Sequence, residues 1–407
     1  MKKIAIVSTY KIDCGIARFT ETLESSFNKN DIQVTVFPLN RNELKQSFGG
    51  TQKSANIFIE QLTKELKNFD AVSIQYEYSL LADSISESAE RLLDIAKANQ
   101  NTTITFHTII NKGLRPKSSS TLKNLVTFQI KKAITQRIQN VRSTRPFNIE
   151  LSLFKKLNAL NSKFIVHTNA SQNLLTNNFK LTKVFSHPLA YTNQQDKEKY
   201  PHSICRTKLL NKLGLSENSY LIGVFGFLGG YKGFEYAIET LRLLDSNYKL
   251  VICGGLHPNA IKHGNLNDIS NLTKQIQQKE NKKTLLNERV FFLGSLEDDE
   301  MYEAISAMDM CWLPYLEVGQ EASAIASEVS ELGKRIIFSR TQTFEEYRKY
   351  KMRKDTLFFE ISNCEELRLK TLRYDEMTKE QLLEQTAPIQ NHLELQANFY
   401  TDVLLNK

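Results

Sequence analysis

The chain has 407 residues, of which 41% are hydrophobic and 24% charged, and its net charge is +8. These proportions are typical of a soluble globular protein, and the length suits two domains of about 150–200 residues each. No run of about 18 apolar residues occurs, so we expect no membrane-spanning helix. The five cysteines are widely spaced, which argues against a metal site and favours a reduced, cytoplasmic protein.

Short strand-like runs alternate with helix-like segments along most of the chain. The runs are rich in β-branched or aromatic residues, which is the pattern of buried strands in parallel sheets. A first series is expected at residues 2–9, 32–39, 70–77, 102–109 and 163–168. A second series is expected at residues 220–227, 248–255, 289–294, 309–314 and 334–340. Most of the strands are followed by an amphipathic helical pattern.

The two series predict an α/β protein with two doubly wound domains. The polar stretch 191–204 is the best candidate for a linker, so we expect domains at residues 1–190 and 205–375. Residues 376–407 are expected to be helical and are a candidate to cross back to the first domain. Ligands of such sheets bind beyond the carboxyl ends of the strands, which directs attention to the loops there.

The loop after the first strand, TYKIDCGIARFTETL, is the first of three candidate sites. Gly15 permits a close backbone approach at the start of a helix, where anions are favoured. The three-glycine spacing of a dinucleotide fingerprint is absent. An ordinary turn in which Asp13 caps the helix is the alternative interpretation.

The second candidate is VFGFLGGYKGFEYAIETL, which reads as a strand, a glycine-rich turn and a helix. Gly226, Gly229, Gly230 and Gly233 surround Lys232, whose charge opposes the dipole of the following helix unless an anion is near. We therefore favour a ligand phosphate at this turn over a merely tight connection.

The third candidate lies in LPYLEVGQEASAIASEVSELGKRIIFS. A helix is expected to begin near Ser323, and its unbonded amides suit a diphosphate. Glu328, inside that helix, could accept hydrogen bonds from both hydroxyls of a ribose. The alternative is that Glu328 and Glu331 are surface residues that only solvate the helix.

The three candidate segments, in their order along the chain, resemble those of glycosyltransferase family 4, whose members are retaining enzymes with the GT-B fold. The resemblance spans nearly the whole chain and implies two Rossmann-like domains that face a cleft. It implies transfer of a hexosyl unit from a UDP-sugar or GDP-sugar to a glycan, glycolipid or lipid-linked acceptor. No carboxylate cluster suited to a metal is evident, so we expect neither a metal nor another cofactor to be required.

The resemblance also assigns roles to individual residues. Lys232, followed by Gly233, matches the lysine that binds the donor diphosphate, and Glu328 matches the glutamate that binds the ribose. His107, in FHTI, matches the histidine beside the transferred sugar. The expected donor-binding set is Gly15, Gly226, Gly230, Lys232, Gly319, Glu321, Ala322, Ser323 and Glu328. The expected catalytic set is His107, Lys232 and Gln320, and the acceptor set is Asp13, Arg18 and Glu77.

Two positions depart from the family's pattern. Phe227 stands in place of an arginine, so one diphosphate contact is missing or comes from another residue such as Arg18. Gln320 stands eight positions before Glu328, where the family often has a second glutamate, and it can hydrogen-bond a sugar hydroxyl without a charge. A sugar epimerase of the same fold is one alternative function. A non-catalytic protein that binds nucleotide-sugars or nucleic acid is another, although no specific nucleic acid is expected.

The segment from Lys112 to Lys156 is strongly basic, with eleven lysines and arginines against one acid, Glu150. Apolar residues recur within it at helical spacing, which predicts an amphipathic helix. One interpretation is a solvated basic face packed on the first domain. The other is a surface for anionic lipid headgroups or a lipid-diphosphate acceptor, which would make the protein peripheral at the inner face of the membrane.

Overall fold

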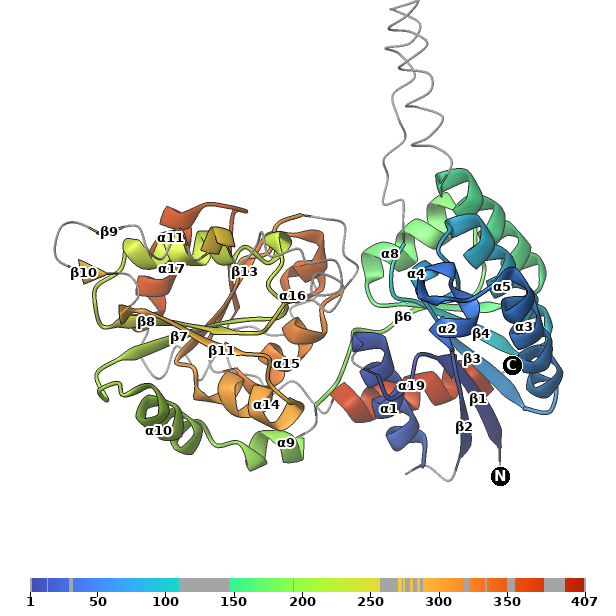
Figure 1. The fold of residues 1–407 in the computed structure, drawn as a ribbon, viewed down its shortest axis with the longest axis horizontal. Helices are drawn as coiled ribbons and strands as arrows, with labels where there is room; N and C mark the ends of the chain where they lie inside the picture. The colour runs from blue at the N-terminus through green and yellow to red at the C-terminus, as the bar shows by residue number, and fades with distance from the viewer. Residues whose placement is uncertain are drawn as a thin grey trace, which may run out of the picture. The chain divides into compact units, whose positions relative to one another are not determined.

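The computed structural model describes residues 2–12, 14–28, 32–109, 146–192, 194–256, 270–272, 274, 279–280, 284–285, 288–317, 322–333, 335–349, 356–376 and 392–405. The chain divides into two compact units, Met1–Pro188 with Leu395–Lys407, and Leu189–Glu394. Each unit is built on a parallel six-stranded sheet with helices packed against it (Figure 1). The prediction of two doubly wound α/β domains is therefore confirmed.

The sheet of the first unit has the order β2-β1-β3-β4-β5-β6, and every neighbouring pair is parallel. Its strands are β1 (Lys3–Ser8), β2 (Gln33–Pro38), β3 (Ala71–Tyr76), β4 (Thr102–Phe106), β5 (Lys163–Val166) and β6 (Val184–Ser186). Every residue of β3 and β4 is buried, as expected of parallel strands that helices cover on both faces. The strand order reverses between β1 and β3, so the loops after these two strands diverge and leave room for a ligand.

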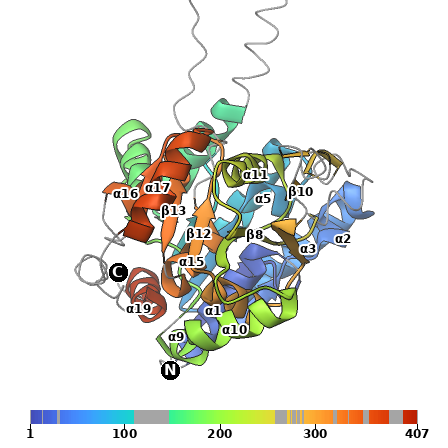
Figure 2. The same cartoon turned by 90° about the vertical axis from the view of Figure 1, so that its left-hand side faces the viewer.

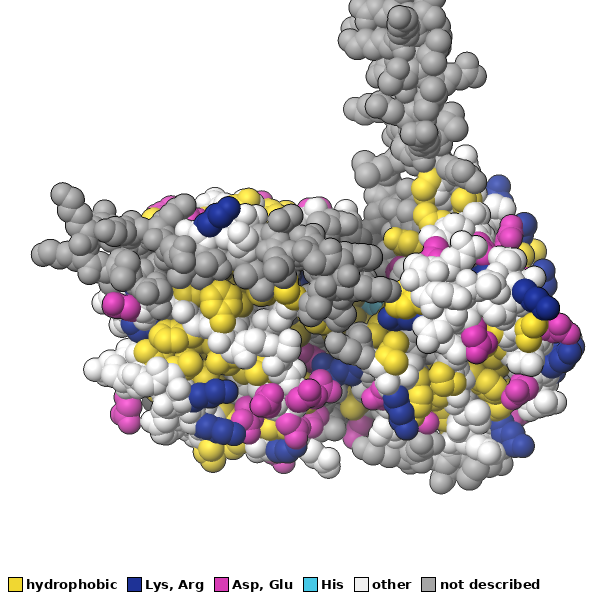
Figure 3. Space-filling view, in the orientation of Figure 1, with side chains coloured by type: hydrophobic (Ala, Val, Ile, Leu, Met, Phe, Trp, Pro, Cys, Tyr) yellow, Lys and Arg dark blue, Asp and Glu magenta, His cyan; other side chains and the backbone are white. Residues whose placement is uncertain are grey.

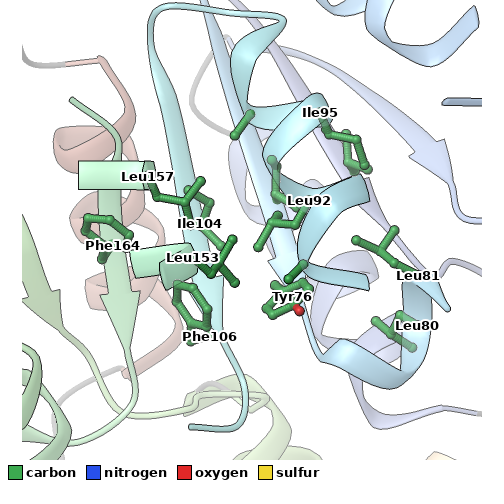
Figure 4. Close-up of a cluster of buried hydrophobic side chains, with 14 of the residues drawn as sticks. Tyr76, Leu80, Leu81, Leu92, Ile95, Ile104, Phe106, Leu153, Leu157 and Phe164 are labelled. Atoms are coloured by element: carbon green, nitrogen blue, oxygen red, sulfur yellow. The ribbon is translucent and has the colours of Figure 1, made fainter. Parts of the chain in front are cut away.

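One face of this sheet packs on helices that begin with clear capping signals. These are α2 (Arg41–Leu44), α3 (Gln52–Leu66), α4 (Tyr78–Leu81), α5 (Ile85–Lys97) and α8 (Asn169–Asn173), together with a helix at 146–159. Helix α1 (Gly15–Asn28) lies on the opposite face. Thr51 and Ser54 form a capping box at the start of α3, and Ser84 caps α5. Figure 4 shows the apolar core between sheet and helices. It includes Tyr76, Leu80, Leu81, Leu92, Ile95, Ile104, Phe106, Leu153, Leu157 and Phe164.

The last helix, α19 (His392–Leu405), ends on the first unit and is fastened there by two side chains. Asn101 donates a hydrogen bond to the carbonyl of Leu404 at 2.8 Å, and the Lys163 ammonium donates to the carbonyl of Val403 at 2.7 Å. A cation at the carboxyl end of a helix also matches its dipole. The terminal carbonyls of α19 are thus satisfied by residues at the start of β4 and β5.

The sheet of the second unit has the order β11-β8-β7-β12-β13-β14, again with parallel pairs only. Its strands are β7 (Tyr220–Phe225), β8 (Tyr248–Cys253), β11 (Val290–Gly294), β12 (Met310–Leu313), β13 (Ile336–Ser339) and β14 (Thr356–Phe359). This is the strand order of a dinucleotide-binding fold, with its reversal between β7 and β12. A short antiparallel pair, β9 (Lys279–Glu280) and β10 (Thr284–Leu285), lies outside this sheet.

Helices cover both faces of the second sheet. They are α9 (Gln194–Lys199), α10 (His202–Leu213), α11 (Phe234–Arg242), α14 (Asp298–Ala307), α15 (Ala324–Leu332), α16 (Glu345–Lys349) and α17 (Cys364–Glu376). Helices α11 and α17 lie side by side over one face (Figures 1 and 2), and α10, α14 and α15 pack together on the other. The stretch 191–204, expected as a linker, contains α9 and the start of α10.

One group of acidic side chains on the second unit has a basic partner on a neighbouring helix. Figure 3 shows acidic side chains gathered over α14, whose first turn holds Asp298, Asp299 and Glu300. Asp299 pairs with Lys199 at 3.1 Å, so this acidic group is partly neutralised by a neighbouring helix. None of the helices in the described ranges is both long and apolar enough to cross a membrane. Most of the basic segment, residues 112–145, lies outside the described part of the chain.

Candidate functional site

The glycine-rich turn of the second unit is held at the end of β7 by main-chain hydrogen bonds. The amide of Gly226 donates to the carbonyl of Cys253 at 2.9 Å, and the amide of Leu228 donates to the carbonyl of Gly255 at 2.8 Å. A Cβ on Gly254 would lie 2.0 Å from the carbonyl oxygen of Gly226. Only glycine therefore permits the ends of β7 and β8 to approach this closely.

The same turn is seated on the segment that follows β12. Gly233, which precedes α11, has φ +72°, and a Cβ there would lie 1.9 Å from the carbonyl oxygen of Pro314. The amide of Leu316 donates to the carbonyl of Tyr231 at 2.7 Å. The loops after β7 and β12 thus meet at the position where the strand order reverses, which is where open α/β sheets bind their ligands.

Lys232 lies at this meeting point and is 5% exposed. Its ammonium donates a hydrogen bond to the Tyr315 hydroxyl at 2.5 Å and stands 3.8 Å from the centroid of the Tyr315 ring. The Tyr231 ring lies on another side, with its centroid 5.0 Å from the ammonium. Burial lowers the pKa of Lys232 from 10.5 to about 7, because the charged form loses its hydration. Within the described residues, aromatic rings and a hydroxyl surround this cation.

Tyr315 connects Lys232 to the start of helix α15. The Tyr315 hydroxyl lies 3.2 Å from the Ser323 hydroxyl, and the Ser323 oxygen accepts a hydrogen bond from the amide of Ala326. Burial raises the pKa of Tyr315 far above its usual range, so the phenol keeps its proton. The cation and the amino end of α15 therefore form one electropositive region. Tyr315 was not among the predicted site residues; its position directly after a strand was the signal that could have found it.

Glu328, inside α15, is completely buried. The interpretation that Glu328 lies on a solvated helix surface is therefore wrong. Its charge contributes to raising the pKa of Tyr315, so the two side chains are electrostatically coupled. Burying a carboxylate is expensive, and proteins retain one where it serves a specific contact. The structure thus links Lys232 to Ser323 through Tyr315 and places Glu328 within electrostatic range of the same tyrosine. Gly226 and Gly230 lie in the turn of Lys232, and Ala322 lies at the entry to α15.

Four predicted residues, Asp13, Gly319, Gln320 and Glu321, lie outside the described ranges. Of the remaining predictions on the first unit, Gly15 opens α1 at an exposed position, and Arg18 is half-buried one turn later. Glu77 caps α4 by accepting a hydrogen bond from the amide of Ser79 at 3.3 Å. The structure therefore gives the Glu77 carboxylate a local structural contact.

His107 follows β4 and belongs to a line of polar side chains at the strand ends. Its Nε2 lies 3.0 Å from Oε1 of Gln75, on β3, and its Nδ1 lies 3.2 Å from Nε2 of His167, which follows β5. Phe19 of α1 packs edge-on against both rings. Burial, and secondarily the proximity of His167, holds the pKa of His107 well below 6.5, so its imidazole is neutral. The sequence analysis predicted His107 as a site residue but not Gln75. A position near the end of a strand does not by itself distinguish a site residue from other polar residues.

Comparison with known proteins identifies the fold. Residues 206–368 match the family model described as glycosyl transferases group 1. HepE of Anabaena in complex with UDP and glucose aligns with TM-score 0.58 and 15% identity, covering 99% of this chain and 96% of that one. Sucrose-phosphate synthase from Thermosynechococcus elongatus aligns with TM-score 0.64 and 14% identity, covering 100% and 97%. The fold is GT-B.

A third GT-B structure gives the same result. A UDP-forming α,α-trehalose-phosphate synthase from Burkholderia xenovorans aligns with TM-score 0.65 and 12% identity, over 100% of this chain and 99% of that one. No curated protein matches the sequence. At these identities the structural likeness establishes the GT-B fold alone. The family match covers the strands and helices that carry Lys232, Ser323 and Glu328, so it falls on the unit with the electropositive region.

Proposed function

We propose that the protein is a retaining glycosyltransferase that moves a hexosyl unit from a nucleoside-diphosphate sugar to an acceptor hydroxyl. One observation carries this proposal: a buried lysine and the amino end of α15 meet at the strand-order reversal of the second unit. A diphosphate is the ligand whose charge and size suit that arrangement. The match to group 1 glycosyl transferases over the same unit supports the reaction class.

In this proposal the donor is held mainly by the second unit. Lys232, the glycine turn and the amides near Ser323 bind the diphosphate, and Glu328 accepts hydrogen bonds from the ribose. Fixed positive charge at the leaving diphosphate stabilises the transition state, which is often the largest contribution available to such a reaction. A UDP-sugar is the first donor to test, because HepE has been solved with UDP-glucose and an Escherichia coli trehalose-phosphate protein with UDP-2-fluoro glucose. A GDP-sugar is the second.

The acceptor is assigned to the first unit. Of the predicted acceptor residues, Arg18 lies on α1 after β1 and Glu77 follows β3, and the sheet reverses its order between these two strands. We propose a glycan, glycolipid or lipid-linked acceptor, reached by a protein that is peripheral at an anionic membrane and takes part in polysaccharide biosynthesis. The basic residues of Lys112–Lys156 support the membrane contact through their charge. Because Lys232 and helix amides supply the positive charge in this scheme, transfer is expected to persist in EDTA.

A thermal-shift screen with UDP, GDP, ADP and their sugars tests the donor assignment. A ligand at 100 times its Kd stabilises the native state by about 2.7 kcal/mol, which raises the Tm measurably. The expected result is a rise with UDP or GDP and with the matching sugar. Release of nucleotide with and without acceptor then tests transfer. An isomerised donor formed without acceptor would indicate an epimerase, and binding without turnover a non-catalytic protein. No shift with any nucleoside diphosphate would overturn the proposal.

A further inference from the structure

Four groups at the strand ends of the first unit form a continuous hydrogen-bonded line. Gln75 contacts Nε2 of His107 at 3.0 Å, and Nδ1 of His107 contacts Nε2 of His167 at 3.2 Å. Nδ1 of His167 then contacts the main-chain carbonyl of His187, also at 3.2 Å. Both ring nitrogens of each of the two linked histidines are therefore engaged, and His167 is 2% exposed. Because the line ends at a carbonyl, the nitrogen that carries the hydrogen in each of its hydrogen bonds can be deduced.

A main-chain carbonyl only accepts hydrogen bonds, so Nδ1 of His167 must carry a hydrogen. In a neutral His167 the other nitrogen, Nε2, is then a lone pair. Nδ1 of His107 must therefore carry the hydrogen between the two rings. This leaves Nε2 of a neutral His107 as a lone pair that faces the Gln75 amide.

Gln75 can satisfy this lone pair with its NH₂ group, since the two ends of an amide are interchangeable in assignment. Its carbonyl would then face the Ser73 hydroxyl, 3.1 Å away, and a hydroxyl can donate as well as accept. The opposite arrangement places Nε2–H of His107 on the Gln75 carbonyl, and it requires a doubly protonated His167. His167 is 2% exposed, and a buried imidazolium is costly, so the arrangement with a neutral His167 is favoured.

We propose that His167 is a positioning residue that holds His107 as its Nδ1–H tautomer, with the Nε2 lone pair as the group that receives a ligand. The Phe19 ring packs in a T-shaped geometry against both imidazoles, which restricts their rotation. A ligand hydroxyl can replace the Gln75 amide at this lone pair, whereas a phosphate or carboxylate oxygen would be repelled by it. The assignment of this hydroxyl to a sugar rests on the proposed function. The tautomer of His107 is inferred from the hydrogen bonds alone and does not depend on that function.

Histidine-selective ¹⁵N NMR of the full chain at pH 8 reads the tautomer directly. The His107 signals are assigned as those that disappear from the spectrum of the His107→Gln variant. We expect a protonated Nδ1 and an unprotonated Nε2 at His107 in the parent protein. A protonated Nε2 at His107 would overturn the proposal, and this measurement on the parent needs no variant at position 167.

Two substitutions of His167 separate its two contacts. Asparagine reaches the position of Nδ1 and keeps the bond to the His187 carbonyl, but it cannot reach His107. Glutamine reaches the position of Nε2 and can still accept the hydrogen of His107 Nδ1. We expect His167→Asn to shift His107 to the Nε2–H form and His167→Gln to retain the Nδ1–H form. His202→Asn, on the second unit, removes a histidine that also contacts a main-chain carbonyl and should leave the His107 signals unchanged.

The activity measurement separates this inference from the proposed function. His167→Asn should lower kcat of sugar transfer about 10- to 100-fold, the range typical of a displaced reacting geometry. Its Kd for UDP should stay that of the parent, and His167→Gln should recover most of kcat. An unchanged kcat with a changed tautomer would overturn the positioning role. Failure of the parent to bind any nucleoside diphosphate would instead count against the proposed function, whatever the tautomer.

Discussion

The Lys232 ammonium stands 3.8 Å from the centre of the Tyr315 ring and donates a hydrogen bond to the hydroxyl of that same ring. A ring face stabilises a cation by about 0.5–2 kcal/mol, which is weaker than a buried carboxylate would be. Among the described residues no carboxylate pairs with Lys232, so an anionic ligand need displace none of them. The arrangement keeps a cation in place while leaving its charge available, which is the condition for binding a diphosphate tightly.

Removal of this cation should weaken binding of the diphosphate but not of the nucleoside. A charge-assisted hydrogen bond contributes about 1.5–3 kcal/mol, so Lys232→Ala should raise the Kd for UDP about 10- to 150-fold. The Kd for uridine should be unchanged, because the nucleoside lacks the phosphates. Calorimetry of both ligands with both proteins checks this. Equal affinity of parent and variant for UDP would remove Lys232 from the diphosphate site.

Donor binding should take up a proton above neutral pH. The pKa of Lys232 is about 7 in the free protein, so a large share of the amine is neutral at pH 8. A bound diphosphate favours the charged amine and raises this pKa, so the complex holds more protons than the free protein. Affinity is then expected to fall as pH rises from 7 to 9, by up to about tenfold per pH unit.

Calorimetry at pH 8 in two buffers of different ionisation enthalpy measures this uptake. Lys232→Arg is the matched control, because arginine stays charged throughout this range and should bind UDP without taking up a proton. A buffer-independent heat in the parent would contradict the assignment of the low pKa to a diphosphate-binding lysine.

Glu328 should determine the preference for ribose. The side chain is fully buried in α15, and its carboxylate is proposed to accept hydrogen bonds from the ribose hydroxyls. Glu328→Gln keeps the shape but loses the charge, so it should weaken UDP binding about tenfold. Parent and variant should also differ in their discrimination against 2′-deoxy-UDP and 3′-deoxy-UDP. If both proteins rank the three nucleotides alike, Glu328 has a structural role only.

Gly233 should be required for both the stability of the second unit and donor binding. Alanine there would have φ +72° and a Cβ 1.9 Å from the Pro314 carbonyl oxygen, so the loops after β7 and β12 would separate. We expect Gly233→Ala to lower the free energy of unfolding by about 2–4 kcal/mol. The single tryptophan, Trp312, is buried in β12 and reports this unfolding by its fluorescence.

Gly229→Ala is the matched control for this substitution. Its φ is −137°, and a Cβ would meet the Tyr231 ring at an ordinary 3.4 Å. Alanine at an unstrained position also reduces the entropy of the unfolded chain, so stability should be unchanged or slightly higher. Similar losses in both variants would show that any added side chain disturbs this turn.

Much of the fold and part of the candidate site could be predicted from the sequence. Alternation of strand and helix patterns identified five strands of each six-stranded sheet but missed β6 and β14, and the glycines around Lys232 identified the turn after β7. Tyr315 and Gln75 were not among the predicted residues, because their significance comes from contacts with Lys232 and His107, which are distant from them in the chain. The burial of Glu328 was equally hidden, since a glutamate flanked by serine and valine in a short helix fits a surface as well as a core. The capping role of Glu77 depends on the turn that follows β3, which composition alone does not define.

The basic segment should direct the protein to anionic membranes. Eleven basic residues and one acid lie within Lys112–Lys156, and each basic residue near an anionic leaflet contributes about 1 kcal/mol of attraction. We expect the protein to sediment with vesicles that contain phosphatidylserine at low salt and to be released as salt is raised, because screening shortens the range of the attraction.

Changing Lys131, Lys132 and Arg137 together to glutamate should abolish sedimentation and lower transfer to a lipid-linked acceptor, while donor hydrolysis continues. The charge-matched control changes Lys53, Lys64 and Lys97, exposed residues of α3 and α5, to glutamate and should retain vesicle binding. If the parent ignores these vesicles at low salt, or if both triple variants lose binding equally, the segment has no specific membrane role and is structural or contacts another protein.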